Sequence, residues 1–276
     1  MKKHAFTLLL ALVLVIGLLP VTAHAGQLDN GLVYEVYADH VEITGYTGSA
    51  TEVVIPAQIA DLPVTTIGAR AFYDCESLTS ISIPESVTSI GTSAFSCCVN
   101  LTSITLPDSI TSIGVRAFEG CDGLTSFSIP ESVTSINDAT FVGCSNLTSV
   151  DLPEGITSIG ASAFSTCTSL TSIDLPDSLT YLGNWAFATC ESLTSISIPD
   201  GITSIMNATF ACCTSLTSID LPDSLTYLGN WAFATCESLT SISIPDGITS
   251  IMNATFACCT SLTSIDLPDS LTYLGN

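Results

Sequence analysis

A 23-residue repeat constrains the fold of this chain more than any other feature of its sequence. Counted from a leucine, the stretch LTSISIPESVTSIGTSAFSCCVN begins at Leu78, and units of the same length follow it without a gap. A single unit is too short to bury its own apolar face, so stacked units must share one continuous core, as in a solenoid. Units begin at residues 78, 101, 124, 147, 170, 193, 216 and 239, with an incomplete unit before residue 78 and a truncated last unit from 262.

Apolar residues recur at fixed positions of each unit, numbered here from its leucine. Alternation at positions 4 and 6, ended by proline at position 7, predicts a short strand, and positions 10–13 predict a second extended segment. Ala or Thr at position 17, Phe at 18 and Cys at 21 have the spacing of one short helical or 3₁₀ turn. The pattern predicts a β-rich α/β solenoid with short parallel strands on one face and short helical or 3₁₀ turns on the other.

The full pattern LTSIxIPxSVTSIGxxAFxxC resembles the BspA-type (Treponema-type) leucine-rich repeat of secreted and surface proteins. The resemblance covers residues 50–276, the expected solenoid. The preceding residues 26–49 resemble the β-hairpin that caps the N-terminus of such solenoids. The resemblance implies adhesion to host or neighbouring-cell proteins, such as components of the extracellular matrix.

The N-terminus has the layout of an export signal. Lys2 and Lys3 precede an apolar run from Phe6 to Leu19, and a small-residue cleavage site ends at Ala25. The run is shorter than the roughly 20 residues that cross a membrane. We therefore predict a signal peptide over residues 1–25, no membrane insertion after its removal, and a secreted or cell-surface location in a bacterium.

The charge of the mature chain limits its partners. Without residues 1–25 the chain has 26 acidic residues but only Arg70 and Arg116 as cations, with no lysine. Nucleic-acid affinity depends on Lys and Arg that neutralise phosphates, so nucleic acid and anionic membranes are excluded as partners. Proteins, among them basic or extracellular-matrix proteins, are the expected partners.

Cysteine spacing indicates packing more than cross-linking. Twelve cysteines in an exported chain first suggest disulfides, and adjacent units come within disulfide reach. A cysteine at position 21 of every unit instead favours a ladder of buried thiols that act as small apolar side chains. Cys97, Cys212 and Cys258 lie at position 20 and are expected to face outward. The nine position-21 residues are Cys75, Cys98, Cys121, Cys144, Cys167, Cys190, Cys213, Cys236 and Cys259.

Two surfaces are candidates for binding. On the expected concave strand face, position 3 is always serine and position 5 becomes acidic towards the C-terminus, at Asp151, Asp174, Asp220 and Asp266. A second acidic row at position 8 is interpreted as solvated turn residues in preference to a cation site.

The second surface is aromatic. Position 12 holds Tyr181 and Tyr227, and position 16 holds Trp185 and Trp231. These four rings either form a repeated binding patch or merely cover the neighbouring unit, whose position 16 is alanine. The sequence leaves both interpretations open.

Catalysis lacks the usual residues. Beyond residue 25 the only histidine is His40, and serines and threonines recur in rows instead of converging on a base. We expect no catalytic residue, no metal site and no cofactor. The predicted function is a secreted or surface protein-interaction module, with a structural spacer as the alternative.

The end of the sequence repeats a larger block. Residues 170–215 and 216–261 are identical, and LTSIDLPDSLTYLGN begins a third copy that stops at position 15 of its unit. A solenoid end without a cap exposes its core and strand edges. We therefore expect end-to-end self-association through an uncapped C-terminus if the chain ends there.

Overall fold

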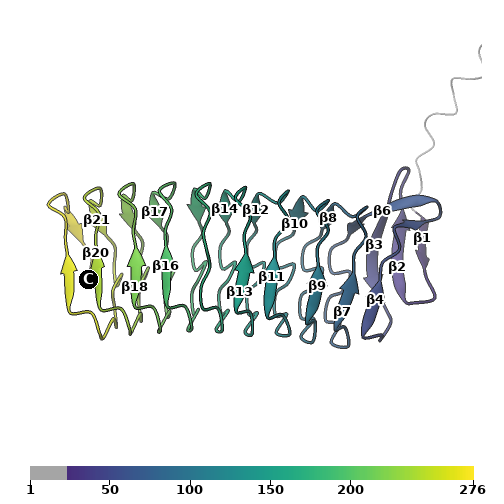
Figure 1. Ribbon diagram of the computed structural model, residues 1–276, viewed down its shortest axis with the longest axis horizontal. Helices are drawn as coiled ribbons and strands as arrows, with labels where there is room; N and C mark the ends of the chain where they lie inside the picture. Colours follow the sequence, from purple (N-terminus) through teal and green to yellow (C-terminus); the bar gives the residue numbers. More distant parts are fainter. Residues whose placement is uncertain (1–23) are drawn as a thin grey trace, which may run out of the picture.

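Short strands of successive repeat units stack in two parallel rows along an elongated solenoid (Figure 1). The computed structural model describes residues 24–276. The predicted signal peptide lies outside these residues except for His24 and Ala25, which belong to the first strand. Each 23-residue unit is one turn of the solenoid, as the repeat predicts.

Three antiparallel strands form the N-terminal end. They are β1 (His24–Gln27), β2 (Leu32–Val36) and β3 (Val41–Tyr46), paired in the order β1-β2-β3. β3 then pairs in parallel with β6, which makes this meander continuous with the repeats. The ring of Tyr46 packs on Phe72 with 5.5 Å between centroids, so the meander also covers the first aromatic side chain of the core.

The first row contains the predicted strand at positions 3–5 of the units. Its central residue points into the core while its neighbours face solvent, the alternation expected of a half-buried strand. The unit that begins at residue 170 forms no strand at these positions. The first row comprises β4 (Glu52–Val54), β7 (Ser80–Ser82), β9 (Ser103–Thr105), β11 (Ser126–Ser128), β13 (Ser149–Asp151), β16 (Ser195–Ser197), β18 (Ser218–Asp220), β20 (Ser241–Ser243) and β22 (Ser264–Asp266).

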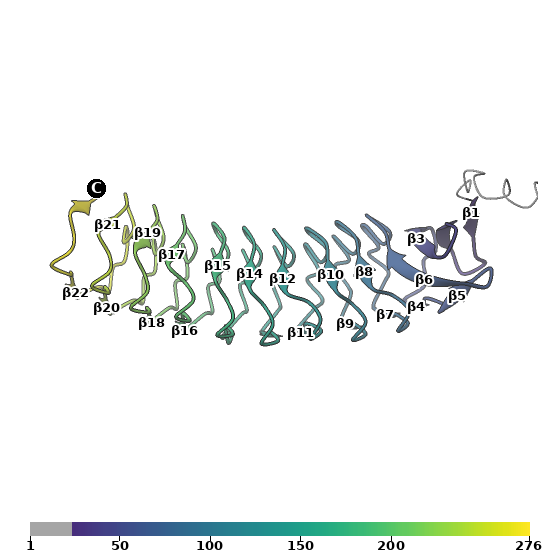
Figure 2. The same cartoon turned by 90° about the horizontal axis from the view of Figure 1, so that it is seen from above.

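The second row contains the predicted extended segment, which is assigned as strand at positions 12–13. Figure 2 shows this row separated from the first across the thickness of the solenoid. β5 (Gln58–Ile59) pairs antiparallel with β6 within the incomplete first unit. The second row comprises β6 (Leu62–Ile67), β8 (Ser89–Ile90), β10 (Ser112–Ile113), β12 (Ser135–Ile136), β14 (Ser158–Ile159), β15 (Tyr181–Leu182), β17 (Ser204–Ile205), β19 (Tyr227–Leu228), β21 (Ser250–Ile251) and β23 (Tyr273–Leu274).

The prediction of short helical or 3₁₀ turns is wrong, since residues 24–276 contain no helix. Positions 16 and 20 take a left-handed conformation, for example Ser162 with φ 56° and Thr166 with φ 60°, and a right-handed helix needs negative φ. Alternate N–H groups also leave the turn: that of Phe164 donates to the carbonyl of Ala186 in the next unit at 2.8 Å. The apolar spacing correctly predicts which side chains of the turn are buried. The alternate backbone N–H groups, however, bond to the next unit and do not close a helix within the turn.

A ladder of phenylalanines forms the centre of the core. Rings from Phe72 to Phe256 stack unit on unit with centroids 5.2–5.7 Å apart and planes within 8° of parallel. Every ring from Phe72 to Phe233 is fully buried. Each unit therefore depends on both neighbours for the burial of its largest side chain.

The cysteines at position 21 line the same core as free thiols. From Cys98 to Cys236 they are fully buried, and each of these thiols donates to the phenylalanine carbonyl of the preceding unit, as Cys144 Sγ does to Phe118 O at 3.1 Å. Cys97, Cys212 and Cys258 at position 20 are half-buried or exposed, as predicted. The structure thus agrees with a ladder of buried thiols.

Candidate interaction surfaces

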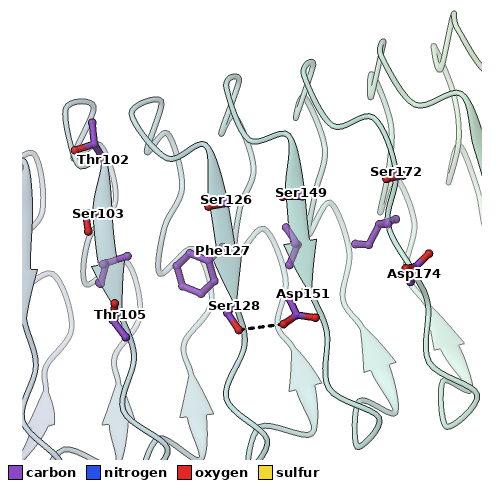
Figure 3. Close-up of a pocket in the computed structure, with 13 residues that line it drawn as sticks. Thr102, Ser103, Thr105, Ser126, Phe127, Ser128, Ser149, Asp151, Ser172 and Asp174 are labelled. Carbon is purple, nitrogen blue, oxygen red and sulfur yellow. Dashed lines mark hydrogen bonds between the residues drawn. The ribbon is translucent and has the colours of Figure 1, made fainter.

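A shallow hollow of about 540 Å³ lies on the first-row face, across the units from Thr102 to Asp174. It is lined by the buried Phe127, Val150 and Ile173 and the half-buried Ile104, together with small hydroxyl side chains. Figure 3 shows Phe127 between the labelled serines of adjacent units. Serines dominate because position 3 is serine in every complete unit. This surface offers many weak hydrogen-bonding groups, and its one large side chain, Phe127, is buried and cannot act as an anchor.

The acidic candidates lie at exposed positions of this face. Asp151 and Asp174 line the hollow on adjacent units, and Ser128 Oγ donates to Asp151 Oδ2 at 3.4 Å (Figure 3). Asp220 in β18 and Asp266 in β22 are exposed farther along the row and outside the hollow. Only the first two of the four carboxylates are therefore brought into one concavity.

The aromatic candidates belong to the other row. Tyr181 in β15 and Tyr227 in β19 pair with serines on the flanking strands. Trp185 and Trp231 follow on the adjoining turns and are 50% and 53% exposed. The intervening Ala208 is buried, so the rings flank a covered unit and still present half of their own surface. The two interpretations of the aromatic residues are therefore compatible.

A hydrogen-bonded asparagine ladder supports the turns that carry the tryptophans, and the sequence reasoning missed it. From Asn207 onward, the N–H of the asparagine at position 15 donates to the side-chain oxygen of the asparagine in the previous unit. Asn207 donates to Asn184 Oδ1 at 3.1 Å, and Asn230 donates to Asn207 Oδ1 at 2.9 Å. The signal was recurrence at position 15, in Asn184, Asn207, Asn230, Asn253 and Asn276.

Replacing Asn207 with alanine is expected to lower the free energy of unfolding by about 1 kcal/mol, because Asn207 Oδ1 accepts both the backbone and the side-chain N–H of Asn230. Asn207→Asp is the matched control. It keeps an acceptor oxygen, as Asp138 does for the N–H of Ala161 at 2.7 Å. Urea unfolding of both variants checks this, and an equal loss in the two would show that the acceptor does not matter.

Metal-binding and membrane-spanning features are not found in the part of the chain that the structure describes. No group of three or more His, Cys, Asp or Glu in residues 24–276 is placed to hold a metal ion. No segment of these residues forms a helix that could cross a membrane. His40 lies in the N-terminal meander, where its ring stacks on Tyr37 and its Nδ1 is 2.7 Å from Asp39 Oδ1.

Comparison with known repeat families decides the classification. Residues 65–194 and 181–276 match the BspA type leucine rich repeat region. The chain belongs to the BspA-type leucine-rich repeat family. The family resemblance predicted from the sequence is thereby confirmed, and the parallel rows described above show how this BspA-type chain builds its solenoid.

Solved structures of bacterial proteins share this architecture. A leucine rich cell surface protein from Faecalibacterium prausnitzii is 30% identical, with 91% of this chain and 90% of that chain covered and a TM-score of 0.59. The Treponema pallidum leucine-rich repeat protein is 31% identical, covering 79% and 87% with a TM-score of 0.54. The pneumococcal vaccine antigen PcpA, at 16% identity and a TM-score of 0.50, shares the fold. Among curated proteins none matches the sequence.

Proposed function

We propose that this BspA-type protein is exported and acts at the bacterial cell surface as a protein-interaction module that mediates adhesion. The observation that carries the proposal is the 30% identity, over nine-tenths of both chains, to a leucine rich cell surface protein. The predicted signal peptide supports export. An extended array of repeats also offers a long surface to a partner and little material for a catalytic centre.

The acidic hollow on the first-row face supports a basic partner. Asp151 and Asp174 are exposed there, and complementary charge steers association and sets its dependence on salt. Collagen and laminin are suitable matrix probes, and cytochrome c is a suitable basic probe. Saturable binding of at least one of them by the full exported chain supports the module, whereas no binding at low or high salt supports a structural spacer.

Replacing Asp151 and Asp174 together with asparagine is expected to weaken binding of the basic probe roughly tenfold at low salt, since each exposed ion pair contributes up to about 1 kcal/mol. Surface plasmon resonance in 50 and 500 mM salt measures the loss. Asp200→Asn with Asp223→Asn is the matched control, because it removes the same charge from the turn at position 8. An equal loss in that control would assign the effect to net charge and not to the hollow.

A further inference from the structure

One column of the solenoid contains all the tryptophans of the chain and both arginines of residues 24–276. Position 16 is Arg70 and Arg116 in the N-terminal half and Trp185 and Trp231 in the C-terminal half. Arg and Trp are among the residue types that dominate protein-binding hot spots. The first-row face has neither, so the residues best suited to anchor a partner are gathered here, in what we call the turn column.

The backbone of the turn column is unusual for large side chains. Arg70, Arg116, Trp185 and Trp231 have φ between 55° and 59°, a left-handed conformation that is an outlier for bulky residues and costs of order 1 kcal/mol or more. The N–H of Trp185 donates to the carbonyl of Asn207 at 3.0 Å. The N–H groups of Arg70, Arg116 and Trp231 donate to the next unit in the same way. The backbone of each anchor is thus held between units, which fixes the direction of its Cα–Cβ bond.

Exposure in the turn column depends on side-chain size. The small residues Ser93, Ala139 and Ala208 are buried. The tryptophans are about half exposed, and the side chain of Arg116 is 59% exposed. Ser162 and Ala254 are half-buried. The large side chains therefore project from a column whose small residues are buried or half-buried, and about half of each tryptophan surface is left uncovered by the rest of the chain.

Charge distinguishes the two halves of the turn column. The guanidinium of Arg70 lies 4.8 Å from the ring centroid of Tyr73. Arg116 Nε is 4.0 Å from Glu119 Oε2, at the limit of an ion pair. In an otherwise strongly acidic chain, these are the only arginine or lysine side chains beyond residue 25, and each can attract a carboxylate. The tryptophan half offers exposed apolar rings instead.

We propose that the turn column binds an extended polypeptide segment of a partner protein, with carboxylates at Arg70 and Arg116 and apolar side chains on Trp185 and Trp231. Seven units separate Arg70 from Trp231, roughly 34 Å at the spacing of neighbouring strands, which a segment of about ten extended residues spans. The two carboxylates would lie about three residues apart. This inference rests on the proposed function and names the surface and the ligand chemistry that serve it.

The test uses random 12-residue peptides displayed on phage and selected on the full exported chain. Because the chain has only two tryptophans, both in the turn column, their fluorescence reports its occupation directly. Selected peptides are expected to shift tryptophan emission to the blue and to bind Trp185→Ala with Trp231→Ala at least tenfold more weakly. Arg70→Gln with Arg116→Gln is expected to weaken the binding of selected peptides that contain Glu or Asp. The same double variant is expected to have no effect on versions of these peptides in which Glu and Asp are replaced by Gln and Asn.

The controls separate this inference from the proposed function. Ser149→Ala with Ser172→Ala alters the first-row hollow and is expected to leave peptide binding unchanged, and unfolding midpoints verify that each variant folds. Selection of no peptide, or equal binding to wild type and both column variants, overturns the turn-column site. If hyaluronan shifts the tryptophan emission and no peptide does, the turn column binds an anionic glycan, and the proposal of a polypeptide ligand is overturned. If the matrix or basic probes bind wild type and the column variants equally well, the proposed function is retained without the turn-column site. If none of these probes binds, the proposed function is contradicted.

Discussion

Raising the pH from 8 to 10 is expected to unfold this protein, because its core contains thiols that cannot ionise in place. Burial raises the pKa of Cys144 and Cys213 to about 12, and raises the pKa of the other deeply buried thiols as well. In the unfolded chain a cysteine has a pKa near 8.5–9. The other thiols whose pKa is raised chiefly by burial are Cys121, Cys167, Cys190 and Cys236.

The sign follows from proton linkage. Below about pH 8.5 these thiols are protonated in both states and add no pH dependence. Above it only the unfolded chain releases protons, so each buried thiol costs about 1.4 kcal/mol of stability per pH unit. Six such thiols together remove roughly 8 kcal/mol one unit above their unfolded pKa, comparable with the whole stability of a typical domain.

Urea unfolding at intervals between pH 7.5 and 10 measures this effect. Cys144→Ala with Cys213→Ala is expected to reduce the dependence on pH by about two protons, whatever these substitutions do to stability at pH 7. Cys212→Ala with Cys258→Ala, at position 20 and outside the buried ladder, removes the same number of thiols and is the matched control. An equal change in both double variants would show that the effect does not belong to the buried thiols. A pH-independent stability, or fewer than about nine free thiols in the unfolded, unreduced chain, would contradict the buried-thiol ladder.

Phe164→Ala is expected to lower the free energy of unfolding by about 3–5 kcal/mol, the usual cost of removing a buried phenylalanine. The ring is fully buried and stacks on Phe141 and Phe187 with 5.4 Å between centroids on both sides. Since each unit contacts only its neighbours, a cavity in the middle of the ladder weakens both adjoining interfaces. Chemical denaturation measures the loss.

Phe127→Ile provides the contrast for the phenylalanine ladder. Phe127 lies at position 4, where Ile104 and Ile173 stand in other units, and its ring meets Phe118 and Phe141 at 4.8 Å with steep interplanar angles. This change restores the common residue and is expected to cost less than about 1.5 kcal/mol. If Phe164→Ala costs no more than Phe127→Ile, the stacked ladder is not a main source of stability.

Much of this architecture could be predicted because the same apolar pattern recurs in every 23-residue unit. The buried residues at positions 1, 4, 6, 10, 13, 18 and 21 follow from a period of 23. Both rows of strands lie within the segments that the pattern predicts as extended, although the unit that begins at residue 170 forms no strand in the first row. The turn after the second strand was predicted as helical because Ala94, Phe95 and Cys98 have helical spacing. Spacing reports which side chains are buried, but it does not report where the backbone N–H groups find their acceptors.

The residues that make up the candidate binding surfaces were harder to predict from the sequence. Asp151 and Asp174 were named together with Asp220 and Asp266, yet only the first pair lines the hollow. The sequence identifies Arg70 and Arg116 as the remaining cations, and their shared position 16 with the tryptophans gains its meaning only from the exposure of these side chains in the structure. The asparagine ladder could have been found from its recurrence, because five asparagines at one position of consecutive units are themselves a repeat.

The sequence alone determined that this chain is a solenoid with a phenylalanine and cysteine core, since no single unit could bury those side chains without the next. The tertiary structure decided how the turns are built and which side chains remain exposed. The N–H of Trp185 pairs with Asn207 of the following unit instead of closing a helix, and this pairing holds the left-handed turn from which the ring projects. Such bonds join residues 22 positions apart, so only the stacking of units, and not the local sequence, specifies them.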